Sequence, residues 1–68
     1  MTIILNGEKR EFPGINHYTV TELIAALELG PQPVLVELNG EALYERDFPL
    51  KTVTEGNQVE IIRMVAGG

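Results

Sequence analysis

The sequence contains neither cysteine nor serine, and its single histidine is His17. Without cysteine, the chain itself forms no disulfide, thiolate metal site or persulfide. Nucleophilic catalysis needs an activated serine, cysteine, threonine or lysine beside a base, and zinc needs three or four protein ligands. We therefore expect no enzymatic activity, no bound metal and no cofactor.

Basic residues are also scarce, because five Lys and Arg stand against ten Asp and Glu, for a formal net charge of −5. The basic residues are Lys9, Arg10, Arg46, Lys51 and Arg63, scattered along the chain. Nucleic acids and anionic membranes require clustered cations. We expect neither as a partner, and a basic protein surface is the natural complement of this chain.

Long apolar runs are absent as well, since no segment approaches the ~18 residues of a membrane-spanning helix. The first strand reaches Asn6-Gly7 too early for a signal peptide, so we expect a cytoplasmic protein. A chain of 68 residues, 44% of them hydrophobic, has room for one small core and little room for a deep substrate cavity. We expect one domain over residues 1–64 and a flexible tail over residues 65–68.

The periodic segments predict strands and one helix. Asn6-Gly7 and Asn39-Gly40 are typical of type I′ hairpin turns. The helix is predicted to begin at a capping box formed by Thr19 and Glu22, and Gly30-Pro31 is predicted to end it. Strands are expected over residues 2–5, 8–12, 34–38, 42–44 and 58–64, with His17 in a loop and residues 45–54 irregular.

This order of elements predicts an α+β fold with a mixed four- to five-stranded sheet and the helix packed across one face. If the last strand lies beside the first, it is central and parallel to it. The layout is then the ubiquitin-like β-grasp, from which the C-terminus emerges as a free tail.

The last residues, Val65-Ala66-Gly67-Gly68, follow an apolar strand directly. Glycine has no Cβ, so a Gly-Gly end can thread a narrow active site in another protein. We interpret the carboxylate of Gly68 as the reactive group, with Val65, Ala66 and Gly67 as the tail that presents it.

Alternation along the last strand predicts an apolar docking face. Val59 and Ile61 are expected to face the helix, which turns Ile62 and Met64 to the opposite face of the sheet. Ile4 and Leu35 join them if their strands flank the last strand. The alternative is a register shifted by one residue, which would place all of these side chains in the core.

The chain resembles the bacterial sulfur-carrier proteins of thiamine biosynthesis, the ThiS family. The resemblance rests on Asn6-Gly7, on the helix start at residues 19–23, on Ala66-Gly67-Gly68 and on the spacing from Phe48 through Glu55-Gly56-Asn57 to that end. The family often has tryptophan where Phe48 stands and Asp-Gly-Asp where residues 55–57 stand. Together with the predicted docking face, this gives the candidate partner-binding residues Ile4, Leu35, Phe48, Ile62 and Met64.

This resemblance implies a specific chemistry. An ATP-using enzyme of the ubiquitin-activating type would adenylate Gly68, a persulfide donor would convert the adenylate to a thiocarboxylate, and thiazole synthase would take the sulfur. The alternatives are the small subunit of molybdopterin synthase, another sulfur-carrier branch, and a ubiquitin-like interaction module. The approach to the tail, residues 61–65, lacks proline, which favours the thiamine branch.

Overall fold

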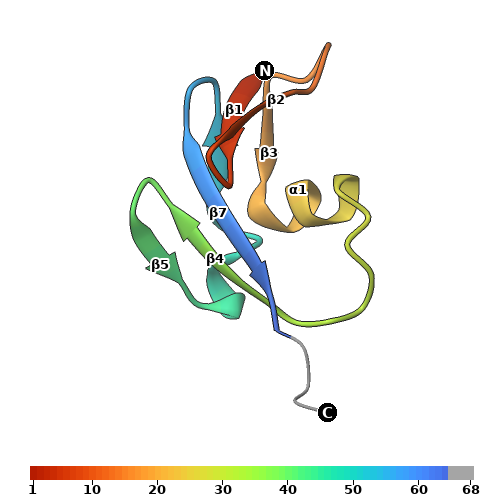
Figure 1. The fold of residues 1–68 in the computed structure, drawn as a ribbon, viewed down its shortest axis with the longest axis vertical. Coiled ribbons are helices and arrows are strands. Elements are labelled where there is room, and N and C mark those ends of the chain that lie inside the picture. The colour runs from red at the N-terminus through yellow and green to blue at the C-terminus, as the bar shows by residue number, and fades with distance from the viewer. Residues whose placement is uncertain (65–68) are drawn as a thin grey trace.

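The fold is built on a five-stranded mixed sheet with strand order β2-β1-β7-β4-β5 (Figure 1). The structure, a computed structural model, describes residues 1–64; the predictions for residues 65–68 lie outside this range. The strands are β1 (Thr2–Leu5), β2 (Glu8–Glu11), β4 (Val34–Leu38), β5 (Glu41–Leu43) and β7 (Gln58–Arg63). Strand β7 is central, parallel to β1 and antiparallel to β4. The predicted mixed sheet with a central last strand is confirmed.

Helix α1 spans Val20–Ala26 and begins where the sequence predicts. Glu22 N donates to Thr19 Oγ1 at 3.1 Å, and Thr19 N donates to Glu22 Oε1 at 2.8 Å, which completes the capping box. The predicted end at Gly30 is wrong. Leu27 is the C-cap, and Glu28 then adopts a left-handed φ of 52° that turns the chain out of the helix.

Two further strands form a separate two-stranded sheet beside the helix. Strand β3 (His17–Thr19) pairs antiparallel with β6 (Thr52–Thr54), and the 3₁₀ helix η1 (Glu45–Asp47) precedes β6. The prediction of a loop at His17 is wrong, and so is the prediction of irregular chain throughout residues 45–54. Val20 N donates to Lys51 O at 2.9 Å, so this small sheet also positions the start of α1.

The hydrophobic core lies between α1 and one face of the large sheet. Its fully buried members come from the helix, from three strands of the large sheet and from β6; they are Ile3, Val20, Leu23, Val36, Val53 and Val59. Within residues 1–64 no polar or charged residue is buried. The sheet therefore has an inner face, which packs on the helix, and an outer face, which is open to solvent.

Candidate functional site

The outer face of the sheet carries exposed apolar side chains near the end of β7. Val59 and Ile61 are buried, whereas Ile62 is 56% exposed. Leu35 on β4 lies directly opposite Ile62 and is 53% exposed. The predicted alternation is confirmed, and the register shifted by one residue is excluded.

Met64 extends this group beyond the end of β7. Its N–H donates to Pro33 O at 2.8 Å, and its side chain is 42% exposed. We call Leu35, Ile62 and Met64 the apolar patch. The patch lies at the end of the sheet from which the chain continues into residue 65.

Ile4 shares the outer face but is not part of the apolar patch. It is half-buried on β1 and lies opposite Gln58, four residues before Ile62 on β7. At about 3.3 Å per residue that separation is about 13 Å. Between the two, Glu37 on β4 lies directly opposite Glu60 on β7.

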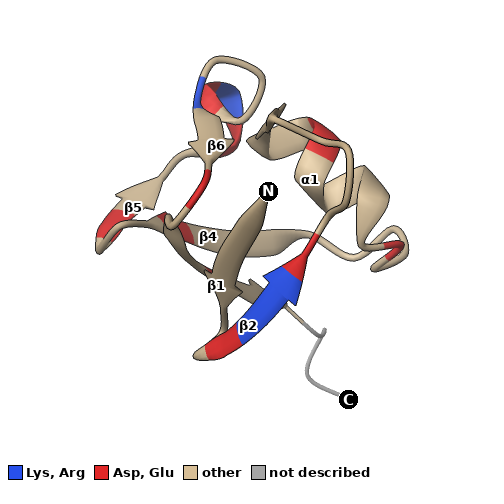
Figure 2. Cartoon of the chain, turned by 90° about the horizontal axis from the view of Figure 1, so that it is seen from above, with Lys and Arg blue, Asp and Glu red and all other residues tan. Residues whose placement is uncertain are grey.

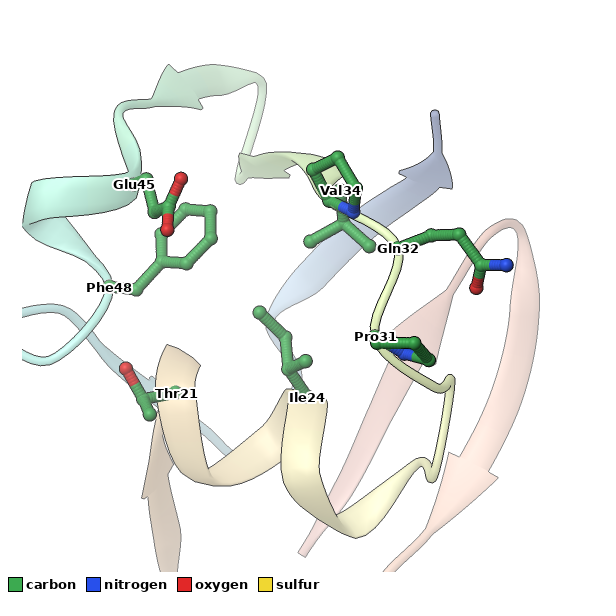
Figure 3. A pocket seen from close by; sticks show the side chains of 8 residues that line it. Thr21, Ile24, Pro31, Gln32, Val34, Glu45 and Phe48 are labelled. Atoms are coloured by element: carbon green, nitrogen blue, oxygen red, sulfur yellow. The ribbon is translucent and has the colours of Figure 1, made fainter. Parts of the chain in front are cut away.

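Phe48 packs in the core on the inner side of the sheet, so it is not part of the outer face. It is 7% exposed and packs in the core. It also forms one wall of a pocket of about 320 Å³ between α1, η1 and the segment before β4, where Ile24 and Val34 are other walls (Figure 3). Its position after η1 places the ring in the hydrophobic core, so partner binding by Phe48 stays a prediction.

Two turn asparagines hold the central strand from either side, which the sequence did not indicate. Asn6 Oδ1 accepts from Ile61 N at 2.8 Å, and Asn6 Nδ2 donates to Ile61 O at 3.2 Å. Asn39 Oδ1 accepts from Gln58 N at 2.9 Å. Asn6 N also donates to Val59 O at 2.9 Å, and beyond that bond the Asn6 side chain continues the pairing along β7.

Within residues 1–64 no three His, Cys, Asp or Glu side chains are placed to hold a metal ion. The hydrogen bond from the Thr19 backbone N–H lowers the pKa of the Glu22 carboxyl, and a bond with the Thr19 side chain lowers it further. That shift arises from the helix cap. Over the same residues, no helix is both long and apolar enough to span a membrane.

A mixed sheet with a central last strand, one helix across its inner face and an exposed apolar patch beside the exit of that strand defines a ubiquitin-like β-grasp protein. The sequence profile of the ThiS family matches residues 3–68. The chain belongs to the ThiS family.

Solved structures agree with this assignment. The crystal structure of the thiamine biosynthesis protein (ThiS) from Geobacter metallireducens is 38% identical, each chain covers all of the other, and the TM-score is 0.88. An NMR solution structure of a thiamine biosynthesis protein from the same organism is also 38% identical, with all of this chain and 88% of that chain covered and a TM-score of 0.85.

A curated relative places a similar sequence within a larger protein. The thiazole synthase of Paramagnetospirillum magneticum is 31% identical over 68 residues, which are all of this chain and 20% of that protein. The chain thus spans a fifth of the length of this relative.

Proposed function

We propose that this protein is a sulfur carrier for the formation of the thiazole of thiamine. The observation that carries the proposal is the ThiS match over residues 3–68, which includes the Gly67-Gly68 end. The likeness to a segment of a thiazole synthase supports thiazole synthase as the acceptor of the sulfur. The chain carries the sulfur, and its partners supply all catalytic groups.

The chemistry follows from the poor reactivity of a carboxylate. A partner of the ubiquitin-activating type joins the Gly68 carboxylate to the α-phosphate of ATP, and pyrophosphate leaves. The terminal sulfur of a persulfide then forms a C–S bond as AMP leaves. A thiol attacks the other sulfur of the resulting acyl disulfide, which breaks the S–S bond and leaves a thiocarboxylate on Gly68 and a disulfide as the second product.

Mass spectrometry of the intact chain tests the carrier role. After incubation with the adenylating enzyme of the same organism, ATP and a persulfide donor, we expect one oxygen to be replaced by sulfur at Gly68. Deletion of Gly68 should abolish the exchange while the melting temperature and circular dichroism stay unchanged, because the buried residues that the structure describes lie between Ile3 and Ile61. Normal exchange in the deletion variant would contradict the proposal, and an isopeptide-linked product would indicate a protein modifier.

Growth of a deletion strain tests the pathway. We expect a requirement for thiazole or thiamine, with molybdoenzyme activity retained. Loss of molybdoenzyme activity with thiamine synthesis intact would assign the protein to the molybdopterin branch.

The docking surface for the adenylating enzyme is, in this proposal, the apolar patch. Contiguous exposed apolar side chains favour protein binding, and these lie where the chain continues toward Gly68. Ile62→Asp and Met64→Asp should weaken binding of the enzyme with little change in stability. Leu50→Asp is the matched control, because Leu50 is also exposed and apolar but lies outside the patch. Equal effects of all three substitutions would argue against docking at the patch.

A further inference from the structure

The outer face places two carboxylates directly opposite each other. Glu37 on β4 and Glu60 on β7 are both exposed and form one cross-strand pair. Directly opposed residues of antiparallel strands have Cβ atoms about 4.5–5.5 Å apart, and like charges there are destabilising. Within residues 1–64 neither carboxylate has a hydrogen-bond partner. Hydrogen bonds to the described residues therefore do not offset the repulsion between these carboxylates, and a cation placed over the pair would relieve it.

A hollow adjoins this acidic pair. It has a volume of about 140 Å³, and its walls include Glu37, Glu60, Gln58 and Ile4. Gly7 and Gly40, at the tips of the two hairpin turns, complete the lining. The space equals that of four or five water molecules at ~30 Å³ each, which fits the end of one long side chain.

The apolar patch begins one step further along the same face. The pair Leu35–Ile62 follows the pair Glu37–Glu60 by two residues on each strand, a spacing of about 6.6 Å. Lys and Arg lie mainly on β2 and near β6, whereas the charged residues of β4 and β5 are all acidic (Figure 2). On the outer face, Lys9 lies opposite Ile4, which places it two strands away from β7. The hollow, the acidic pair Glu37–Glu60 and the apolar patch thus follow one another along the outer face. We call these three together the strip, and it ends at Met64.

We propose that this strip docks a partner protein segment that presents an arginine flanked by apolar side chains. The guanidinium would lie over Glu37 and Glu60, because its planar fork has five donors and can serve two carboxylates at once. Its aliphatic stem would lie against Ile4, and the apolar neighbours would cover the apolar patch. The inference rests on the proposed function, since the partner meant is the adenylating enzyme.

Other ligands fit the strip less well. A phosphate backbone would be repelled by the acidic pair. A divalent metal ion would lack a third protein ligand among the described residues. Charge complementarity therefore favours a basic protein segment.

The test uses the double variant Glu37→Gln/Glu60→Gln and measures binding and stability together. The matched control is Glu8→Gln/Glu41→Gln, which also changes the net charge from −5 to −3, while Glu8 and Glu41 lie opposite the inner-face residues Leu5 and Leu38. We expect the Kd for the adenylating enzyme to rise roughly tenfold or more in the test variant, because charge-assisted hydrogen bonds are lost. The control should stay within about twofold of the unaltered protein.

Stability gives the second readout. The melting temperature of the test variant should equal or exceed that of the control, because the repulsion is removed. A variant that binds less tightly yet melts no lower supports the inference. A lower melting temperature than the control would show that the carboxylates serve folding and would overturn it.

The outcomes separate this inference from the proposed function. If the unaltered protein is thiocarboxylated and the test variant binds as tightly as the control, the inference is wrong and the carrier role stands. If the unaltered protein neither binds the enzyme nor gains sulfur, both fail.

Discussion

The substitution Asn6→Gly should destabilise the end of β7 that leads to the apolar patch. Asn6 has a left-handed φ of 51°, which glycine adopts without strain, so the change removes the side-chain hydrogen bonds to Ile61 and keeps the turn. Both bonds are partly buried. A net hydrogen bond contributes about 0.5–1.5 kcal/mol, and a buried N–H left without a partner costs about 1–3 kcal/mol. We expect a loss of about 1–3 kcal/mol in the free energy of unfolding.

That loss is large for a domain of this size. At ~0.05–0.15 kcal/mol per residue, such a domain has roughly 3–10 kcal/mol of stability in total. Each 1 kcal/mol lowers the melting temperature of a 60–100-residue domain by about 4–8 °C. Thermal denaturation followed by circular dichroism measures the change, and hydrogen exchange of the Ile61 amide reports whether the opening is local.

Asn39→Gly is the matched control. Asn39 has the same φ of 51° and also bonds β7, but its bond to Gln58 N is exposed, so water replaces it. The backbone bond from Asn39 N to Gln58 O, 2.7 Å, remains in this variant. Because both variants add one glycine, their difference isolates the partly buried bonds. Equal melting temperatures for the two variants would refute this reasoning.

Three further predictions concern the helix, the patch and the charge. Glu22→Gln should lower the free energy of unfolding at pH values above the ordinary carboxyl pKa of 4.5, because the pKa of Glu22 is lowered in the folded protein. This loss should vanish as the pH falls through the folded pKa. Denaturant titrations at several pH values measure it. Leu23→Ala should cost about 2–5 kcal/mol by chemical denaturation, whereas Ile62→Asp should cost under about 1 kcal/mol because Ile62 is exposed. The association rate with the adenylating enzyme should fall as salt screens the acidic surface beyond ~8 Å, and a rate independent of salt would contradict this.

Strands with alternating apolar and polar side chains can be predicted from the sequence. Strands that form only because a distant segment pairs with them cannot. Strands β1 and β4 match the predicted bounds, and Ile62 falls on the predicted face, because two-residue periodicity fixes the side of the sheet. Strands β3 and β6 have three residues each, too few for a periodic pattern. Strands β3 and β6 form because the fold brings these two distant segments side by side, where they pair with each other.

The same limit applies to the candidate site. Alternation predicts Leu35, Ile62 and Met64, but it does not apply to Phe48, which follows a 3₁₀ helix. Asn6 is predicted as a turn residue from Asn-Gly alone. Its bonds to a residue 55 positions later depend on β7 lying beside β1, which local sequence does not encode.

Chain length links the apolar patch to the proposed chemistry at Gly68. Gly68 is four positions after Met64 in the sequence, and an extended chain covers at most about 3.3–3.6 Å per residue, so this length of chain spans at most about 14 Å. An enzyme that acts on the Gly68 carboxylate must therefore bring its active site within that distance of the end of β7. An enzyme that comes so close to the end of β7 also comes close to the outer face of the sheet, which presents the exposed apolar side chains of Leu35, Ile62 and Met64 there. Strand β7 is paired with β4 along its length and held by Asn6 on the other side, so the outer face keeps a fixed position relative to the end of β7 at Arg63. Under the proposed function, docking on this face would orient the approach to the Gly68 carboxylate, and the partners would supply the catalytic groups.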